Sequence, residues 1–196
     1  AWTNKGLAMS RLGKHAEAVV TYEKALQIQP DSYETMTNKG GELFLLGRNE
    51  EAIKAFDRAI ELRPDYPQVW NNKGWALLRL GKFAEAVKSF DKVAQIITDG
   101  EAAGIPRLAK IKYEALSNKG LALQELNEHQ EALDAFSKAT TLSGNVHEAW
   151  NYKGYVFEEI GKHQEALDAY DKAIQIKPDF VIAFNNKGLL QDTMGN

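Results

Sequence analysis

The sequence contains no cysteine among its 196 residues. Disulfide bonds, thiolate nucleophiles and thiolate metal ligands are therefore excluded. No apolar run approaches the roughly 18 residues that a membrane-spanning helix needs, and no signal-peptide pattern opens the sequence. We therefore expect no membrane span and no membrane partner. A cytoplasmic location fits this composition.

Neither sign of charge dominates the chain, whose formal net charge is −3. Residues 1–98 carry 14 Lys+Arg and 12 Asp+Glu, whereas residues 99–196 carry 10 and 15. A strongly basic face, which is the usual footprint of a nucleic-acid-binding domain, is therefore absent from the pattern. We expect no nucleic-acid partner, and a modest acidic bias in the second half of the chain.

Patterns typical of catalysis are also lacking, since neither a glycine-rich phosphate loop nor a Ser/His/Asp set occurs. His15, His129 and His163 stand at equivalent points of a repeat, each two residues before a glutamate. One helical turn of this kind cannot supply the three or four ligands of a zinc site. We expect no catalytic residue, no metal site and no cofactor, and hence no enzyme.

The sequence does contain a motif, Asn-Lys-Gly, that recurs along its whole length. Its glycines, with Tyr152-Lys153-Gly154 as a variant, lie 34, 34, 46, 34 and 34 residues apart. They are Gly6, Gly40, Gly74, Gly120, Gly154 and Gly188. Self-similarity at a period of roughly 34 residues indicates an array of stacked helical hairpins.

Each repeat carries the pattern of two amphipathic helices joined by a tight turn. In the third repeat Trp70, Gly74, Leu77 and Leu80 follow the 3.6-residue period of a helix. A residue that tolerates positive φ then follows the first helix in every repeat. These residues are Gly13, Gly47, Gly81, Asn127, Gly161 and Gly195. The second helix alternates small and aromatic residues, as in Ala18, Tyr22 and Ala25, which predicts a close-packed seam.

On these residues the chain resembles the tetratricopeptide repeat family. In the first repeat the matching positions are Trp2, Gly6, Met9, Ala18, Tyr22, Ala25 and Pro30. The pattern recurs in register with local departures, such as Met36 and Leu116 in place of the leading aromatic. The resemblance implies an all-α fold, a right-handed α-solenoid of stacked antiparallel helix hairpins. The hairpins are expected at about 1–30, 31–64, 65–98, 113–144 and 145–178, with a lone helix at 179–196.

The borders between repeats are predicted from Pro-Asp pairs and from one insertion. Asp31, Asp65 and Asp179 follow prolines and are expected to cap the next helix, as is Asn145. An insertion at 99–112 interrupts the period, and Asp99 to Gly104 is expected to be a loop. Pro106 is expected in the first turn of a lengthened helix, with Arg107, Lys110 and Lys112 forming a basic face.

The resemblance also implies a peptide-binding groove lined by the first helix of each hairpin. The first row of groove residues comprises Asn4, Asn38, Asn72, Asn118, Tyr152 and Asn186. Asparagine amides both donate and accept hydrogen bonds and suit the main chain of an extended ligand. The alternative is that these amides bond within the hairpins.

Aromatic and acidic residues of the same helices are candidates for specificity. Phe44, Trp75 and Tyr155 would anchor apolar side chains, because aromatic residues dominate binding hot spots. Glu125 and Glu158, with Glu114, Glu148 and Glu159, would favour a basic ligand in the second half. Cations in the expected groove are few, mainly Arg11 and Arg79.

The predicted function is therefore a scaffold that binds a protein or peptide segment in its groove. One alternative is a regulatory or substrate-recruiting segment of a larger enzyme, and another is single-stranded RNA binding. A third is end-to-end self-association, because the array begins inside a first helix and ends after a lone one, without polar caps. Those bare ends indicate either a longer array or ends that pair with a partner.

Overall fold

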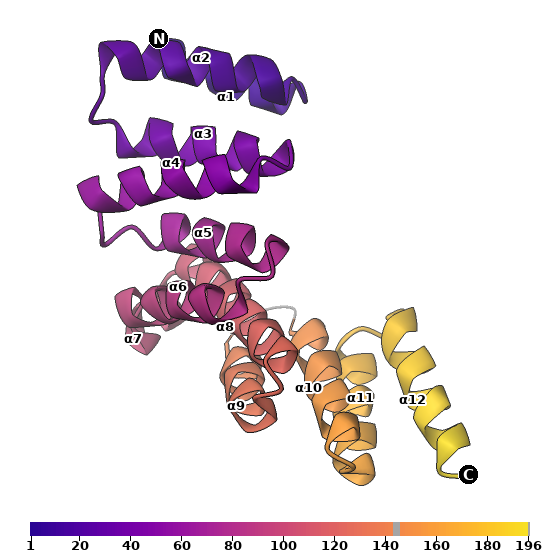
Figure 1. Ribbon diagram of the computed structural model, residues 1–196. Helices are drawn as coiled ribbons and strands as arrows, with labels where there is room; N and C mark the ends of the chain where they lie inside the picture. Colours follow the sequence, from indigo (N-terminus) through magenta and orange to yellow (C-terminus); the bar gives the residue numbers. More distant parts are fainter. Residues whose placement is uncertain (143–145, 196) are drawn as a thin grey trace. The chain divides into compact units, whose positions relative to one another are not determined.

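A computed structural model describes residues 1–142 and 146–195 of the chain. In this part the chain forms twelve α-helices and no strand (Figure 1). The helices divide between two compact units, Ala1–Ile96 and Ile97–Asn196, here called unit 1 and unit 2. None of these helices has the length and apolar character needed to cross a membrane.

Unit 1 consists of three antiparallel hairpins stacked in chain order. Within unit 1, helices that follow one another in the chain pack against each other (Figure 1). The helices are α1 (Trp2–Arg11), α2 (His15–Ile28), α3 (Tyr33–Leu45), α4 (Asn49–Leu62), α5 (Pro67–Arg79) and α6 (Phe83–Ile96). The expected hairpins at 1–30, 31–64 and 65–98 each contain one of these pairs.

Unit 2 has the same arrangement, with one additional short helix at its start. Its helices are α7 (Asp99–Gly104), α8 (Pro106–Glu125), α9 (His129–Thr140), α10 (His147–Glu159), α11 (His163–Ile176) and α12 (Val181–Thr193). α8/α9 and α10/α11 form hairpins, and α12 packs on α11 as a single first helix. The all-α, stacked-hairpin class expected from the repeat is confirmed.

The turns inside the hairpins have the predicted backbone conformation. Gly13, Gly47, Gly81, Gly161 and Gly195 have φ between 69° and 76°, and Asn127 has φ 59°. Positive φ is strained for most L-residues, and asparagine tolerates it better than most residues other than glycine. The single Asn in the series therefore marks the same turn as the glycines do.

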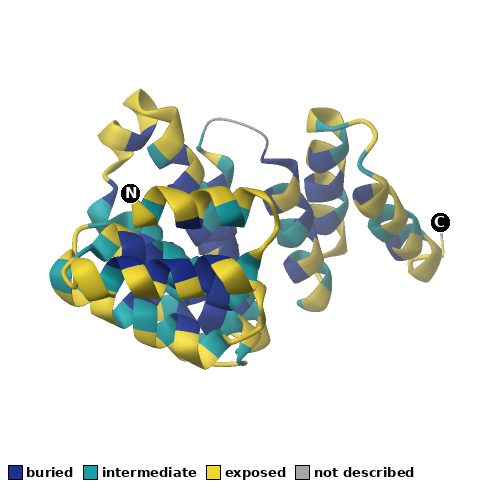
Figure 2. Ribbon diagram, turned by 90° about the horizontal axis from the view of Figure 1, so that it is seen from above, coloured by how far each residue is buried: buried dark blue, intermediate teal, exposed yellow. Residues whose placement is uncertain are grey.

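The repeated glycine inside each first helix is required by an aromatic ring of the following helix. A Cβ atom placed on Gly40 would lie 2.5 Å from the Phe56 ring, and one on Gly154 would lie 2.6 Å from Tyr170. These rings are fully buried, and the buried residues lie along the facing sides of the helices (Figure 2). Gly188 in α12 meets no such ring, because no second helix follows α12 in the chain described here.

The predicted Asp caps are wrong. Ser32 is the N-cap of α3 and accepts a hydrogen bond from the Thr35 amide. Tyr66 and Phe180 occupy the N-cap positions of α5 and α12, without a side-chain cap bond. Each of these helices therefore begins one residue later than the Pro-Asp pairs suggest. The expected cap at Asn145 lies outside the described residues.

The expected loop at Asp99 to Gly104 is also wrong, because these residues form α7. A capping box starts this helix: the Thr98 hydroxyl accepts from the Glu101 amide, and the Glu101 carboxylate accepts from the Thr98 amide at 2.9 Å. Two orphan amides are thereby satisfied at once. Pro106 stands in the first turn of α8, as predicted, so the fourth hairpin starts within the expected insertion.

The three cations of the insertion do not share one exposed face. Arg107 and Lys110 are exposed, whereas Lys112 is buried. The Lys112 ammonium donates to the Ile97 carbonyl and to the Asp99 carboxylate, both at 2.7 Å. Lys112 thus fastens the start of α7 to α8, and the expected basic face is reduced to Arg107 and Lys110.

Candidate functional site

The largest hollow described in unit 1 lies on the face formed by its three first helices. It has a volume of about 550 Å³ and is open to solvent. Its walls come mainly from α1, α3 and α5, with Tyr22 and Phe56 behind them. The lining residues are Leu7, Ser10, Tyr22, Thr37, Asn38, Gly41, Glu42, Phe44, Leu45, Phe56, Tyr66, Gln68, Asn72, Trp75 and Arg79. We call it the unit 1 pocket.

Five residues expected in the groove from the sequence line the unit 1 pocket: Asn38, Asn72, Phe44, Trp75 and Arg79. They meet there because positions one step away from the buried stripe of each first helix point to the same side of the stack. Trp75 remains 40% exposed, so much of its indole is available to a ligand.

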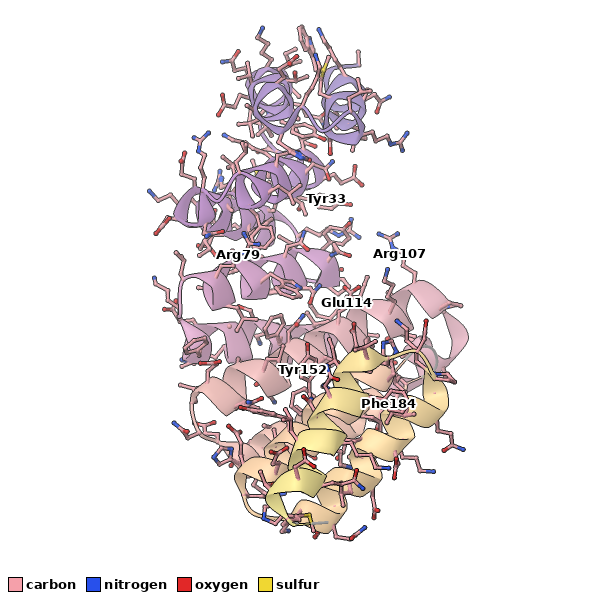
Figure 3. The ribbon with its side chains drawn as sticks, turned by 90° about the vertical axis from the view of Figure 1, so that its right-hand side faces the viewer. Tyr33, Arg79, Arg107, Glu114, Tyr152 and Phe184 are labelled. Atoms are coloured by element: carbon pink, nitrogen blue, oxygen red, sulfur yellow. The ribbon has the colours of Figure 1, made fainter. Side chains whose placement is uncertain are left out.

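Two charged residues line the unit 1 pocket, and they differ in burial and in whether an oppositely charged side chain contacts them. The Glu42 carboxylate is buried and lies 2.7 Å from Nδ1 of His15. The Arg79 guanidinium carbon lies 4.7 Å from the centroid of the Phe44 ring. Within residues 1–142 and 146–195 Arg79 forms no ion pair with a carboxylate, so this charge of the pocket lining has no counter-ion there. Figure 3 labels Arg79 among the side chains of unit 1.

Tyr22 adds a buried hydroxyl to the pocket lining. This hydroxyl has no hydrogen-bond partner among the described residues. Burial, together with the nearby Glu42 charge, raises the pKa of Tyr22 to about 12. The hydroxyl is therefore a neutral donor at any ordinary pH.

Glu42, Tyr22, Tyr66 and Gln68 were not predicted from the sequence as site residues. A signal for Glu42 was present, however. The equivalent positions of the other first helices hold Ala8, Ala76, Ala122, Val156 and Leu190. A single carboxylate in an otherwise apolar row requires a partner, and His15 provides it.

The asparagine row does not behave uniformly. Asn4 is exposed beside a separate shallow hollow that includes Leu7 and Arg11. The Asn72 side-chain oxygen accepts from Gln68 at 2.8 Å. Asn38, at the equivalent position of α3, lines the unit 1 pocket together with Asn72.

In unit 2 the row is less accessible. Asn118 is only 5% exposed, and the Asn186 amide donates to the Asn151 oxygen at 3.1 Å. The Asn186 bond joins α12 to α10 of the preceding hairpin, so it is not the expected bond within one hairpin. The bond of Asn72 with Gln68 does lie within α5, although Asn38 and Asn72 both line the open unit 1 pocket.

Unit 2 presents an aromatic and acidic surface on α8 and α10. Tyr155 is 43% exposed, and its pKa is raised, first by the charge of Glu159 and then by burial, with Glu158 and Glu125 adding to the shift. The Tyr170 hydroxyl donates to Glu158 at 2.8 Å. The predicted residues Tyr155, Glu125 and Glu158 are therefore electrostatically coupled.

Tyr152, the variant member of the first row, is half-buried in unit 2. Its ring stacks on Phe136 with centroids 5.6 Å apart and planes 26° apart. Burial raises the pKa of Tyr152. Figure 3 labels this residue and Phe184 of α12. The stacked ring contributes first to the α9–α10 packing and offers a ligand only its remaining surface.

Two of the three histidines at the repeat turn contact carboxylates of first helices. His15 pairs with Glu42, as described above, and Nδ1 of His129 lies 3.7 Å from the Glu159 carboxylate. No group of three or more metal-ligating side chains occurs among the described residues. His15 and His129 thus join the second helix of one hairpin to the first helix of the next.

Comparison with known proteins agrees with this architecture. Four tetratricopeptide repeat models match residues 1–65, 39–102, 113–146 and 147–180. No curated protein matches the chain.

Solved structures with the same fold include YrrB, described as a TPR protein with an unusual peptide-binding site. It is 20% identical, with a TM-score of 0.72 over 95% of this chain and 90% of that one. MamA has a TM-score of 0.76 at 20% identity, over 88% of this chain and 94% of that one. A MamA segment from Desulfovibrio magneticus gives the same score and identity over 91% and 94%. The repeat motifs, the stacked hairpins and the matching models together show that the chain belongs to the tetratricopeptide repeat family.

Proposed function

We propose that this protein is an interaction module that binds an extended peptide or protein segment along the exposed face of its first helices. The observation that carries this proposal is the unit 1 pocket, where side chains of three successive first helices meet in one open hollow. Membership of a family of interaction scaffolds supports the general role, and YrrB is described as having a peptide-binding site.

The mechanism follows from the rigidity of the frame. Each hairpin is held by a buried ring against a helical glycine, so the groove face does not have to be ordered when a ligand binds. A preformed receptor surface lowers the entropic cost of association. Asn38 and Asn72 would bond the ligand main chain, while Phe44 and Trp75 would contact its side chains.

Unit 2 would take a ligand of different charge. Glu125, Glu158 and Glu159 surround Tyr155 electrostatically, and residues 99–196 carry 15 acidic against 10 basic side chains. We infer that a segment bound on this face is basic. The cytoplasmic location and the absence of catalysis expected from the sequence are part of the same proposal.

The test is a displayed library of random peptides selected on the intact chain, followed by affinity measurements on the enriched peptides. Asn38→Ala combined with Asn72→Ala should weaken binding of groove ligands. Asn185→Ala, an exposed asparagine of α12, is the matched control and should leave binding unchanged. If no peptide is enriched, or if the double variant binds every enriched peptide as well as the parent does, the proposal is wrong.

Self-association is a second candidate, favoured by the exposed surface of α12. Val181, Ile182, Phe184 and Leu189 are each at least half exposed, and Gly188 faces open space. Contiguous exposed apolar side chains are typical of interaction surfaces. Sedimentation velocity over a range of concentrations should show association that Leu189→Glu removes, and a monomer at high concentration would exclude this candidate.

A further inference from the structure

The unit 1 pocket has a chemical character that the general function does not specify. Its walls are apolar: Trp75 and Leu7 are more than one-third exposed, and Leu45 is more than half exposed. Phe44 lies between them on the same lining. Large side chains left in water within a hollow of about 550 Å³ favour an apolar ligand group of comparable size.

The charge available in this pocket is positive. Glu42 contributes little to the surface, because its buried carboxylate is occupied by His15 at 2.7 Å. Arg79 is exposed and stacks on Phe44 at 4.7 Å. Cation–π contact leaves the edge of the guanidinium free to donate hydrogen bonds.

Three of the four other arginines of unit 1 show what such a guanidinium contacts, whereas Arg11 has no ion pair within the described residues. Arg48, Arg58 and Arg63 each pair with a carboxylate two or three residues further along the chain. Arg79 has no such neighbour in the described residues, because Lys82 stands three residues after it. A guanidinium fork fits a carboxylate in both geometry and charge.

A second donor without a partner lies in the same lining. The Tyr22 hydroxyl is buried and unpaired within the described residues, whereas the equivalent hydroxyl of Tyr170 donates to Glu158 at 2.8 Å. The unit 1 pocket therefore holds two groups, Arg79 and Tyr22, that can donate hydrogen bonds and have no acceptor among the described residues.

We propose that the unit 1 pocket selects an acidic–apolar sequence: one aromatic or long aliphatic residue between Phe44 and Trp75, with an adjacent aspartate or glutamate on Arg79. This inference deepens the proposed function and rests on it. Asn38 in α3 and Asn72 in α5 lie on successive first helices of the same lining. This spacing suits a ligand whose main chain continues beyond the pocket on both sides. The carboxylate is therefore assigned to a side chain and not to a C-terminus.

The probe is the same displayed library, with every random segment placed inside a longer carrier so that no free C-terminus is offered. Enriched peptides should pair an aromatic or long aliphatic residue with Asp or Glu within two positions. Trp75→Ala should weaken their binding about 30-fold, as for a buried aromatic hot spot. Arg79→Gln should weaken it about fivefold, as for a partly exposed ion pair.

Matched variants separate this site from unit 2 and from general charge effects. Arg58→Gln removes an exposed charge of α4, and Ile105→Ala removes an exposed apolar side chain between α7 and α8. Both should leave binding of the acidic–apolar peptides unchanged. Replacing the peptide's acid by its amide should cost about fivefold in the parent and nothing further in Arg79→Gln, because both changes remove one contact. Arg79→Glu should shift selection to basic peptides.

Each other outcome is informative. If peptides are enriched and depend on Asn38 and Asn72 but lack the acidic–apolar pair, this inference is wrong while the proposed function stands. Selection that stays acidic with Arg79→Glu would also overturn it. Recovery only of free C-terminal peptides, in a parallel library, would assign the carboxylate to a chain end and contradict the proposal. No enrichment at all would remove the proposed function and this inference together.

Discussion

Unit 1 and unit 2 use the same internal construction and present different surfaces. In both, a helical glycine faces a buried ring: Gly40 faces Phe56, and Gly154 faces Tyr170. On the first-helix face the units diverge. Trp75 lies with an unpaired Arg79 in unit 1, whereas Tyr155, at the same repeat position, is coupled to three glutamates in unit 2. Packing thus constrains one set of repeat positions and leaves another set to vary with the ligand.

The strongest test of this comparison is a pair of substitutions at one repeat position. Gly40→Ala would place a Cβ atom 2.5 Å from the buried Phe56 ring. We expect a loss of about 3 kcal/mol in the free energy of unfolding, at the upper end for overpacking. Gly154→Ala in unit 2 should lose a similar amount. Denaturation by urea, followed by circular dichroism, measures both.

Gly188→Ala is the control with the opposite sign. This glycine has nothing within 4 Å of its would-be Cβ, so the helix propensity of alanine should stabilise α12 by about 0.8–1 kcal/mol. If Gly188→Ala destabilises the protein as much as Gly40→Ala does, the buried ring is not the reason for the repeated glycine.

The next contrast is the inserted α7, which unit 2 carries. Lys112→Met should destabilise unit 2 by about 2 kcal/mol, because the buried Ile97 carbonyl loses its hydrogen bond from the ammonium. The partner side chain, Asp99, is nearly fully exposed. Its pKa is lowered by the hydrogen bond to Lys112 and then by the charge of Lys112. In the Lys112→Met variant, limited proteolysis should cut the chain first near Gly104, while unit 1 stays intact.

The sign of the pH dependence follows from the Asp99 shift. A carboxyl whose pKa is lower in the folded state stabilises the protein above its unfolded pKa, and this contribution is lost as pH falls through the folded value. Acidification should therefore loosen α7 more in the parent chain than in Lys112→Met, where the Glu101 carboxyl, whose pKa the hydrogen bonds from Thr98 lower, is still protonated as pH falls. Equal sensitivity of α7 to acid in both proteins would contradict this account.

How far the sequence predicts this molecule depends on the range of the interaction. The turns were predicted correctly, because positive φ at Gly47 or Asn127 is a local requirement. The predicted caps at Asp31 and Asp65 were wrong. The start of a helix depends on which of several neighbouring polar side chains accepts a hydrogen bond from a first-turn amide, and in α3 this side chain is Ser32. The repeat period thus predicts the stacked hairpins but not the residue at which each helix begins.

The site was predicted only in part for a similar reason. Phe44 and Trp75 were found because they occupy repeat positions that face one side. The state of Glu42 and Tyr22 depends on contacts between hairpins, such as His15 with Glu42 at 27 residues' separation. Local periodicity carries no information on such pairs, and the burial of Asn118 follows from the packing of the lengthened α8.

A smaller effect should separate the two equivalent tyrosines. Tyr170→Phe removes a hydrogen bond to Glu158 and should cost about 1 kcal/mol. Tyr22→Phe removes an unpaired buried hydroxyl and should be neutral or slightly stabilising. Thermal or urea unfolding of the two variants gives the comparison directly, and an equal loss would show that Tyr22 has an acceptor.

Alkaline titration adds a check on Tyr22. Its pKa in the folded protein, about 12, lies above the ordinary value of 10.0. The folded state holds this proton more tightly than the unfolded chain does, so ionisation of Tyr22 costs no stability below pH 10, and stability is lost as pH rises from 10 through about 12. Tyr22→Phe should keep more of its stability than the parent chain over this interval.

The smallest expected effect concerns a ladder of ion pairs between neighbouring hairpins. Lys39, Lys73 and Lys187 each contact an acid 16 residues earlier: Glu23 at 2.8 Å, Asp57 at 2.6 Å and Asp171 at 2.6 Å. Lys153 has Ser137 at that spacing, and its ammonium lies over the Trp150 and Phe157 rings instead.

Ser137→Asp would complete the ladder in unit 2. We expect a gain of about 0.2–1 kcal/mol, the range of partly exposed pairs. The pKa of Lys153, which burial lowers, should rise because a neighbouring carboxylate favours the charged ammonium. Ser137→Asn introduces a side chain of the same size as Asp but without charge, so it should change neither the stability nor the pKa of Lys153. The stability gained with Ser137→Asp should shrink as salt screens the ion pair.

A stability gain that persists at 1 M salt, or that Ser137→Asn reproduces, would mean that the ion pair does not cause the gain. The acids of the ladder would then be placed for the packing of their helices, as the glycines are.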